Sequence, residues 1–541
     1  MLSYRKLAMR VLGRPLHTEG IDSPRPASQR AAAFVLTAAM LITLAAPAFA
    51  KEWYIEDGNI TVKAGDTKGT NKVSQGESTD VPDTDTVITN REKNASSNTV
   101  TIEAKDKDDK VEVTLKDVNI DTSSRNKAAV SVTGEGDTNI KLDGDNALKS
   151  DIYRSGIYGS GSLTISGGEN DSLTAQGGSG ANGISSSGSL TISGGTVTAN
   201  GDDGGRGISS SGSVTISGGS TVTANGGSGT ISGGDGIWSG GGVTISGGST
   251  VTANGGNGGS LVGGDGIRSG GGLTVSDGTV TAKGGNGDSK DGYGGDGIRS
   301  GGVVTISGNT VNAAGGYGGK VGGYGICSFD RVAISGGTVE AAGGNGSTGG
   351  GSGIYSSVID LSGSLELTAK AGSPTGKALL QNGRELDLDT IKDKLGPGAK
   401  VTTTDANGKT KEVSSPLPVE PEGPVIPEES SSSSDDGSAT PSAPVSPLPG
   451  LTVTDKDGQR ISYTSTQSGN TLTVCVGRLT ASFRISLATL RQLRAEGIET
   501  ITFQTILCST TLSVDELLAM GGEDAEAVLT HRFTDSSLTV G

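Results

Sequence analysis

Three tetrapeptides in the middle of the chain combine an acidic residue with an aromatic or basic residue at a fixed spacing. One is Asp-Gly-Ile-Trp and two are Asp-Gly-Ile-Arg, and they recur at intervals of 30 and 31 residues. Their functional side chains are Asp235 and Trp238, Asp265 and Arg268, and Asp296 and Arg299. Carboxylates and guanidiniums can hydrogen-bond polar ligands, and carboxylates also bind hard cations such as Ca²⁺. The regular recurrence predicts a repeated surface, which suits adsorption better than a single reaction centre.

Aromatic side chains gather around the same repeat position. The residues that directly follow successive Gly-Ile dipeptides are Tyr158, Ser185, Ser209, Trp238, Arg268, Arg299, Cys327 and Tyr355. Flat rings with a polar edge suit the faces of sugars. The candidate carbohydrate-binding residues are therefore Tyr158, Trp238, Asp235, Asp265, Arg268, Asp296, Arg299, Tyr324 and Tyr355. Two plainer interpretations stay open, namely rings that only cover loops and a solvated ladder of charges that discourages aggregation.

Several acidic clusters offer oxygen ligands for calcium. They contain Asp106, Asp108 and Asp109 in "KDKDDK", Asp143 and Asp145 in "DGDN", and Asp288 and Asp291 in "GDSKDGYGGDG". None has the spacing of an EF-hand loop. Each cluster is open to interpretation as a calcium site or as ordinary solvated acid.

An internal repeat must position these residues. Eight Gly-Ile dipeptides divide residues 157–354 into units of 24 to 31 residues. Within most units a strand like "TISG" and then a strand like "TVTA" follow the dipeptide, separated by glycine-containing turns. Alternation of apolar and polar residues without helical periodicity predicts short strands. Stacked in register, such units form a right-handed parallel β-helix with three strands per rung, so the predicted fold class is mainly β.

The composition agrees with a thin solenoid. Only 32% of residues are hydrophobic, and glycine occurs 93 times, which supplies corners with positive φ. We expect Ile237, Val243, Ile245, Val251 and Ala253 to point inward, because they alternate with polar residues. Length variation is concentrated between each "TVTA" strand and the next Gly-Ile, and in solenoids such insertions often mark the binding face. Asparagines that follow the alanine in three consecutive units predict a stacked amide ladder, at Asn200, Asn225 and Asn254.

Composition divides the chain into four regions. Residues 1–50 have a basic leader, an apolar run and a terminal Ala-Phe-Ala, which is typical of a bacterial secretory signal peptide. Residues 51–411 contain the β-helix with its caps. Residues 412–450 hold nine of the sixteen prolines and predict an extended linker. Residues 451–541 mix strand and helix patterns and predict a small α+β domain.

The charge balance restricts the possible partners. Without residues 1–50 the chain has 37 basic and 57 acidic side chains, a net charge of −20. Such acidity argues against nucleic acid and anionic membranes, which require basic surfaces. No other stretch is apolar enough to cross a bilayer. We expect a secreted or cell-surface monomer that does not insert into a membrane after signal cleavage.

Histidine scarcity restricts the chemistry. His531 is the only histidine after residue 50, which excludes histidine-based zinc sites and Ser-His-Asp triads. A β-helix lyase or hydrolase could still use calcium, carboxylates and arginine. Cys475 and Cys508 lie in one predicted domain and could form a disulfide or remain buried thiols.

The repeat and the segment before it resemble a known family. The "TISGGTVTANGG…GI" units, preceded by "VTLKDVNI…AAVSVTGEGDTNIKLDGDNAL", are similar to secreted bacterial proteins described as carbohydrate-binding domain-containing, which share a fold with pectate lyases. The resemblance covers about residues 55–370. It implies binding of plant-type polysaccharide, often with calcium and usually without catalysis.

Two other functions remain open beside non-catalytic polysaccharide binding. One is cleavage by a β-helix lyase or hydrolase. The other is a structural or adhesive role, in which flat threonine and asparagine ladders match an ordered surface. A Thr-x-Thr pattern recurs on four units, at Thr196 and Thr198, Thr221 and Thr223, Thr250 and Thr252, and Thr279 and Thr281. Threonine is also simply a favourable residue on an exposed strand.

Overall fold

The computed structural model describes residues 51–415 and, with short gaps, residues 450–540; the gaps are 456–458, 462, 469, 477–479, 506–508, 521–524 and 533–534. The signal peptide predicted at 1–50 and the linker residues 416–449 lie outside the described residues. So does Cys508, and with it the possible disulfide to Cys475. The chain divides into two compact units at the Pro421–Glu422 boundary, and each is described by itself.

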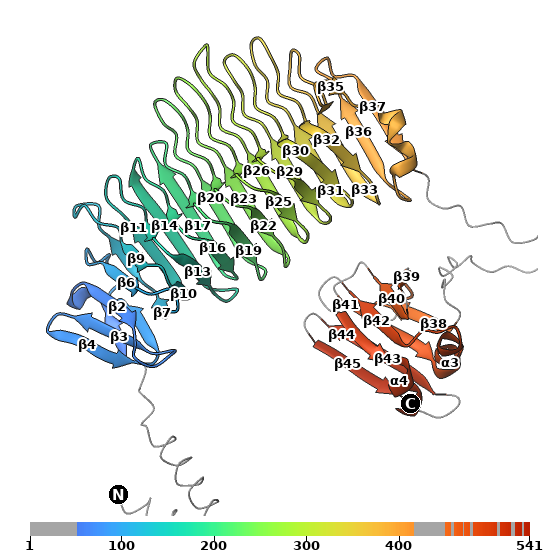
Figure 1. Ribbon diagram of the computed structural model, residues 1–541, viewed down its shortest axis with the longest axis horizontal. Coiled ribbons are helices and arrows are strands. Elements are labelled where there is room, and N and C mark those ends of the chain that lie inside the picture. Colours follow the sequence, from blue (N-terminus) through green and yellow to red (C-terminus); the bar gives the residue numbers. More distant parts are fainter. Residues whose placement is uncertain are drawn as a thin grey trace, which may run out of the picture. The chain divides into compact units, whose positions relative to one another are not determined.

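The first unit is a parallel β-solenoid of about 13 turns (Figure 1). Strands of successive turns pair in parallel, and three rows of strands run along the solenoid. The first row contains β2 (Ile60–Ala64), β6 (Val100–Ala104), β9 (Val130–Gly134), β12 (Ile157–Gly159), β15 (Ile184–Ser186), β18 (Ile208–Ser210), β21 (Ile237–Ser239), β24 (Ile267–Ser269), β27 (Ile298–Ser300), β30 (Ile326–Ile334), β32 (Ile354–Leu361) and β34 (Leu379–Gln381).

The second row follows the first within each turn, and the third row closes the triangle. The second row contains β1 (Glu52–Tyr54), β5 (Thr86–Thr89), β7 (Lys110–Lys116), β10 (Asp137–Asp143), β13 (Ser162–Ser166), β16 (Leu190–Ser193), β19 (Val214–Ser217), β22 (Val243–Ile245), β25 (Leu273–Val275), β28 (Val304–Ile306) and the later halves of β30 and β32. The third row contains β8 (Asn119–Asp121), β11 (Asp145–Lys149), β14 (Ser172–Ser179), β17 (Thr196–Asp202), β20 (Thr221–Asn225), β23 (Ser249–Asn254), β26 (Gly278–Lys283), β29 (Thr310–Ala314), β31 (Gly337–Ala342), β33 (Leu365–Lys370) and β36 (Lys400–Thr404). The three-strand rung predicted from the repeat is confirmed.

Aliphatic ladders fill the interior of the solenoid. Ile237, Val243, Ile245, Val251 and Ala253 are each at most 1% exposed, as predicted from the alternation. Each pairs in register with an aliphatic residue one turn away, identical in three of the five pairs and of similar type in the other two, so that aliphatic side chains stack. This core is continuous along the unit. A thin solenoid can therefore be stable with few hydrophobic residues, because every turn buries its small apolar set against two neighbours.

Glycine-rich loops connect the third row of one turn to the first row of the next. The amide N–H of Gly264 donates to the carbonyl of Gly256 in its own loop, and that of Gly256 donates to Gly234 in the previous loop, both at 2.8 Å. A Cβ on Gly264 would lie 1.9 Å from the carbonyl oxygen of Gly234. The close stacking of these loops, rather than a turn conformation alone, requires glycine here.

Both ends of the solenoid are closed by antiparallel strands. At the amino-terminal end β2 pairs with β3 (Asn71–Gln75), which pairs with β4 (Ser78–Asp83), and the short helix η1 (Ile55–Asp57) lies beside β1. At the other end come β35 (Arg384–Glu385), the short helices η2 (Leu388–Thr390) and η3 (Lys392–Lys394), and β37 (Thr410–Ser414), which pairs antiparallel with β36. These caps cover edges that would otherwise offer unpaired backbone groups. The last strand ends at Ser414, three residues beyond the boundary predicted at residue 411.

The second unit is a small α+β fold, as predicted. One sheet contains β38 (Leu451–Thr454), β41 (Thr480–Ser486), β44 (Glu526–Arg532) and β45 (Asp535–Val540), and the other contains β39 (Thr464–Ser468), β40 (Thr471–Cys475), β42 (Thr500–Gln504) and β43 (Ser509–Ser513). Two helices, α3 (Leu487–Ala495) and α4 (Val514–Met520), contribute leucines to its core. In the described part of the chain, none of the helices has the length and apolar character needed to span a membrane.

Candidate ligand-binding surface

The first row of strands aligns the candidate residues in one register. The residues that directly follow the buried isoleucine at the start of each strand of this row from β12 to β32, and that face outward, form what we call the outer strip, from Tyr158 to Tyr355. Its members in order are Tyr158, Ser185, Ser209, Trp238, Arg268, Arg299, Cys327 and Tyr355. Tyr158 is 44% exposed, whereas the thiol of Cys327 is buried. This burial is the main reason why the pKa of the Cys327 thiol is raised to about 12.

The three predicted aspartates stack beside the strip, and we call them the aspartate ladder. Oδ1 of Asp235 accepts the backbone N–H of Asp265 at 2.9 Å, and Oδ1 of Asp265 accepts that of Asp296 at 2.7 Å. Oδ1 of Asp296 accepts the N–H of Tyr324 at 2.7 Å, which ends the ladder. All three aspartates are at most 6% exposed. The interpretation as a solvated ladder of charges therefore does not hold for the carboxylates, which are buried.

Each aspartate also has an arginine partner. Oδ2 of Asp296 lies 3.3 Å from Nη1 of Arg299, and Oδ2 of Asp265 lies 3.9 Å from Nη1 of Arg268. Asp235 pairs instead with Arg206, whose Nε is 3.1 Å away. Arg206 was missed in the sequence because it precedes a Gly-Ile dipeptide, at the position that aspartate takes in the next three turns. The carboxylates thus hold three arginines along the strip.

Burial and mutual repulsion change the proton affinity of the ladder. Desolvation, followed by the neighbouring Asp296 and Asp235 carboxylates, raises the pKa of Asp265 to about 8. Desolvation also raises the pKa of Asp296 to about 6, against the opposing hydrogen bond from Tyr324 and the charge of Arg299. At neutral pH the middle carboxyl therefore holds a proton, and the arginines are not fully neutralised.

Aromatic rings and guanidiniums contact one another at several positions along the strip. The guanidinium of Arg206 lies over the ring of Trp238, 4.5 Å from its centroid, and that of Arg299 lies 5.2 Å from the centroid of Phe329. The rings of Tyr324 and Tyr355 stack with their centroids 5.1 Å apart. Tyr324 is not a member of the strip, because it lies two residues before the isoleucine of its turn, at the position of the aspartates. Phe329 was not a candidate in the sequence, because it lies in a bend of β30 where the repeat pattern is broken.

A cleft of about 750 Å³ opens at the Tyr158 end of the strip. Tyr153, 78% exposed, and Tyr158 line it together with polar groups that include Asn126 and Arg154. The Nε of Arg154 donates to Oδ1 of Asn126 at 3.2 Å. Asn126 and Tyr153 both have positive φ, 52° and 59°, a strained conformation that often occurs at functional sites. The cleft was missed because Asn126 and Arg154 lie in turns outside the repeat.

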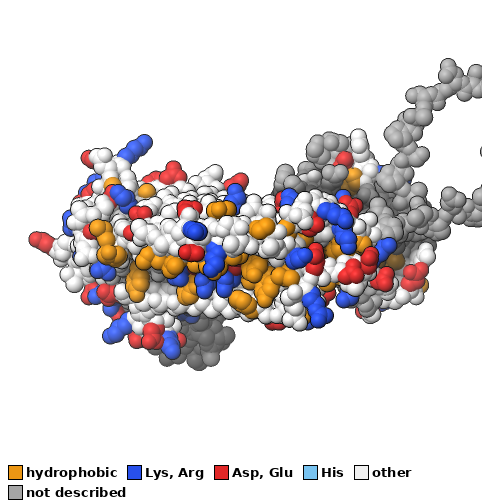
Figure 2. Space-filling model, turned by 90° about the horizontal axis from the view of Figure 1, so that it is seen from above, with side chains coloured by type: hydrophobic (Ala, Val, Ile, Leu, Met, Phe, Trp, Pro, Cys, Tyr) orange, Lys and Arg blue, Asp and Glu red, His pale blue; other side chains and the backbone are white. Residues whose placement is uncertain are grey.

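An apolar band accompanies these groups on one side of the solenoid. Figure 2 shows hydrophobic side chains gathered along the first unit, with basic side chains among them. Exposed apolar residues of the glycine-rich loops are Ile231, Leu261, Val262, Tyr293 and Tyr317. The exposed aromatic residues therefore include Tyr293 and Tyr317 of the loops as well as residues of the strip. The interpretation that rings only cover loops applies to these two tyrosines.

The structure spreads the calcium candidates over separate exposed turns. Asp106, Asp108 and Asp109 lie between β6 and β7; Asp143 and Asp145 lie where β10 meets β11; Asp288 and Asp291 lie in the loop after β26. The Asp109 carboxylate accepts the N–H of Asp106 at 3.0 Å, which uses one of its oxygens within the turn. Within residues 51–415 and the described parts of 450–540, no three acidic, histidine or cysteine side chains come together as a metal-binding group.

Comparison with known proteins assigns neither a family nor a function to the chain. No family model matches the chain, and neither the curated proteins nor the solved structures contain a significant match. The functional argument therefore depends on the geometry of the strip, the ladder and the cleft.

Proposed function

We propose that the mature protein binds extracellular polysaccharide, without cleaving it, along the outer strip and in the cleft at its Tyr158 end. The observation that carries this proposal is the placement of two exposed rings, Tyr153 and Tyr158, at a cleft at one end of the outer strip, which farther along also contains a tryptophan, two arginines and a second tyrosine. Rings offer apolar faces to sugars, and arginines donate several hydrogen bonds to hydroxyls or carboxylates.

The shape of the strip supports a linear ligand. Its residues repeat once per turn, and turns of a parallel sheet are about 4.8 Å apart. A polymer lying along the solenoid would pass one strip position per turn, and its contacts with the tyrosine, tryptophan and arginine positions, each weak alone, would be strong in sum. A secretory signal peptide at 1–50 would place the protein where such polymers occur, either released or at the cell surface.

Calcium enters the proposal as a bridge to acidic polymers. The mature chain has a net charge of −20, so a uronate polymer would be repelled unless arginines or a cation offset this charge. Because the described residues offer no ready group of three metal ligands, oxygens of the polymer would have to complete the coordination. We expect a neutral glucan to bind without calcium.

The absence of cleavage is part of the proposal and is argued from the ladder. The carboxyls with raised pKa are buried, and each uses Oδ1 for a backbone N–H and directs Oδ2 toward an arginine. Such groups position arginines rather than attack a ligand. A lyase or hydrolase would instead release unsaturated uronate products or new reducing ends.

A second candidate function is adhesion to an ordered surface through the third row. Its threonines are in register over four turns, Thr196 with Thr221, Thr250 and Thr279, and likewise Thr198 with Thr223, Thr252 and Thr281. The resulting array of hydroxyls is regular and presents no ring. It would match a crystalline polysaccharide rather than a single soluble chain.

A glycan panel measured with and without EDTA tests the proposal. Trp238→Ala should weaken binding severalfold, because one stacking contact contributes about 1 kcal/mol. Met520→Ala, which changes an exposed apolar residue of the second unit, is the control and should bind like the parent. Equal binding by Trp238→Ala and the parent would reject the strip, and accumulation of cleaved products would favour the enzyme alternative.

A further inference from the structure

A second cleft lies on a different side of the solenoid, against the amino-terminal cap. It has a volume of about 610 Å³, and four strands of the second row, β7, β10, β13 and β16, contribute its lining. Volumes of this size are typical of sites for small organic ligands. It shares no lining residue with the cleft at Tyr158. We call it the cap trough.

Two parallel rows of polar side chains form the walls of the cap trough. One wall consists of Lys110, Asp137 and Ser162, and the other consists of Glu112, Asn139 and Thr164. The two walls are in register from strand to strand, and alternation along each strand directs both outward. The residues between them, Val111, Thr138 and Leu163, are at most 1% exposed and form the floor.

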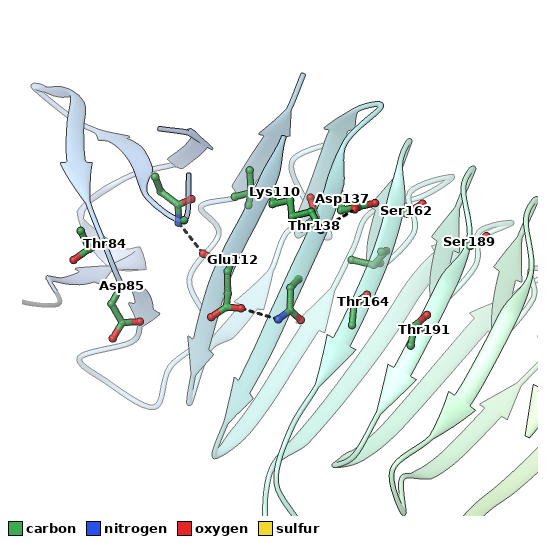
Figure 3. Close-up of a pocket in the computed structure, with 15 residues that line it drawn as sticks. Thr84, Asp85, Lys110, Glu112, Asp137, Thr138, Ser162, Thr164, Ser189 and Thr191 are labelled. Atoms are coloured by element: carbon green, nitrogen blue, oxygen red, sulfur yellow. Dashed lines mark hydrogen bonds and ion pairs between the residues drawn. The ribbon is translucent and has the colours of Figure 1, made fainter. Parts of the chain in front are cut away.

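The cap closes one end of the trough. Gly69, Asn71, Thr84 and Asp85 line that end. Asn71, which is 6% exposed, donates through Nδ2 to the Thr86 hydroxyl at 2.9 Å and to the Glu112 carbonyl at 2.7 Å. These bonds fix the cap against β7, so the end wall is built into the fold. Figure 3 shows Thr84 and Asp85 at this end and Thr191 at the other.

The opposite end of the trough is open. Thr164 continues in register through Thr191 into a row of outward threonines, Thr215, Thr244, Thr274 and Thr305. A chain lying in the trough could therefore extend along the solenoid in one direction only. The geometry favours recognition of a chain end.

The chemistry of the walls selects a hydroxyl-rich, uncharged chain. The lining holds three carboxylates, Asp85, Glu112 and Asp137, against the single ammonium of Lys110, which would repel an acidic polymer. A peptide would need free backbone groups at a strand edge, but those of the floor strands pair between turns. The carboxylates and the amide of the first two turns and the hydroxyls of the third can instead exchange hydrogen bonds with sugar hydroxyls.

We propose that the cap trough binds the terminal sugars of a linear neutral glycan, with the chain end against Thr84 and Asp85 and about one sugar per turn. The length of one sugar along such a chain is close to the spacing of adjacent turns, about 4.8 Å. The site is separate from the outer strip and does not depend on it. A long polymer could be held along its length by the strip and at its end by the trough.

Calorimetric titration with neutral linear tetrasaccharides of glucose, xylose and mannose tests this site. At least one should bind the parent, and Thr164→Trp, which fills the trough, should remove the trough binding site and leave only whatever binding the outer strip provides. Thr305→Trp, in the same register row on β28, should bind like the parent. Asp85→Asn should bind about tenfold more weakly, because it removes hydrogen bonds to a charged group. Circular dichroism of each variant monitors folding.

Two further measurements separate this proposal from others. Trp238→Ala should keep full tetrasaccharide affinity, so that failure of the strip and failure of the trough are distinguishable. A cyclic glucan, which has no chain end, should not bind in the trough. Equal loss of binding in Thr164→Trp and Thr305→Trp, binding of the cyclic glucan as tightly as the linear one, or binding of a Lys/Arg-rich decapeptide in place of every tetrasaccharide would overturn it.

Discussion

Among the polar ladders of the solenoid, one of asparagines and one of aspartates each extend over three turns, and they satisfy their hydrogen-bonding groups in different ways. In the asparagine ladder, Nδ2 of Asn225 donates to Oδ1 of Asn200, and Nδ2 of Asn254 donates to Oδ1 of Asn225, both at 2.8 Å. An amide has both a donor and an acceptor, so the column satisfies itself and stays neutral. Its members are half-buried and have no need of other partners.

The aspartate ladder lacks donors of its own. Each carboxylate takes a backbone N–H from the next turn and an arginine at its outer oxygen. It is also more deeply buried, and desolvation, followed by repulsion from the two neighbouring carboxylates, raises the pKa of the middle member to about 8. The comparison teaches that stacking alone does not make a ladder stable. An acidic ladder requires external partners, and the arginines it recruits lie along the candidate binding strip.

The largest effect is expected from removing one carboxylate of the aspartate ladder. Asp296→Ala leaves the N–H of Tyr324 without its acceptor and Arg299 without its partner, and breaking a buried pair costs about 3–5 kcal/mol. Urea unfolding measures the loss of stability. Asp108→Ala, an exposed acid in a turn, is the control and should cost less than about 0.5 kcal/mol. An equal loss of stability in the two variants would show that the ladder aspartate contributes no more than an exposed surface aspartate.

The aspartate ladder should also make stability depend on pH. Because the pKa of Asp265 is raised from 3.8 to about 8, the folded state retains a proton that the unfolded state releases. The stabilisation from this group is full below about pH 4 and is lost as the pH rises to about 8. The unfolding temperature should therefore fall from pH 5 to pH 8.

Asp265→Asn should reduce this pH dependence, because it replaces the titratable carboxyl in the middle of the ladder by a neutral amide. The amide can donate as well as accept a hydrogen bond. The folded variant should be more stable than the parent at pH 8. Thermal unfolding at both pH values tests this. A parent protein that becomes more stable from pH 5 to pH 8 would contradict the buried, protonated state of Asp265.

A smaller effect is expected in the asparagine ladder. Asn225→Ala removes two side-chain hydrogen bonds in a half-buried position and should cost about 1 kcal/mol. Asn225→Asp should cost more than Asn225→Ala at pH 7, because a carboxylate cannot donate to Asn200 and no arginine pairs with Asn225 in the described structure. If the aspartate variant were as stable as the parent, the difference between the two ladders would not lie in their donors.

The sequence predicted those features that follow from the repeat. Alternation and the Gly-Ile spacing predicted the register, the inward set and the asparagine ladder correctly, because each depends on neighbouring turns being alike. The burial of Asp235, Asp265 and Asp296 was not predictable in this way. It depends on how closely the glycine-rich loops that contain these aspartates stack on one another, and the length of these loops varies from turn to turn.

The parts of the candidate surface that break the repeat were missed for a related reason. Arg206 takes an aspartate position, Phe329 lies in a bend, and Asn126 and Arg154 come from turns of unequal length. No local pattern connects them, and only the fold brings them beside Trp238 and Tyr158. The end wall of the cap trough likewise arises from a hairpin that packs on the solenoid.

Tryptophan emission gives the most direct test that the outer strip binds polysaccharide. The chain has two tryptophans. Trp53 is 2% exposed, and its indole N–H donates a hydrogen bond to Asp83. Trp238 is half-buried on the strip, and the guanidinium of Arg206 lies over its ring. Addition of a bound polysaccharide should change the Trp238 emission in a saturable way, and Trp238→Phe should lose that change while keeping the emission of Trp53. A polysaccharide that binds the parent tightly but leaves the emission of Trp238 unchanged would contradict the assignment of this strip.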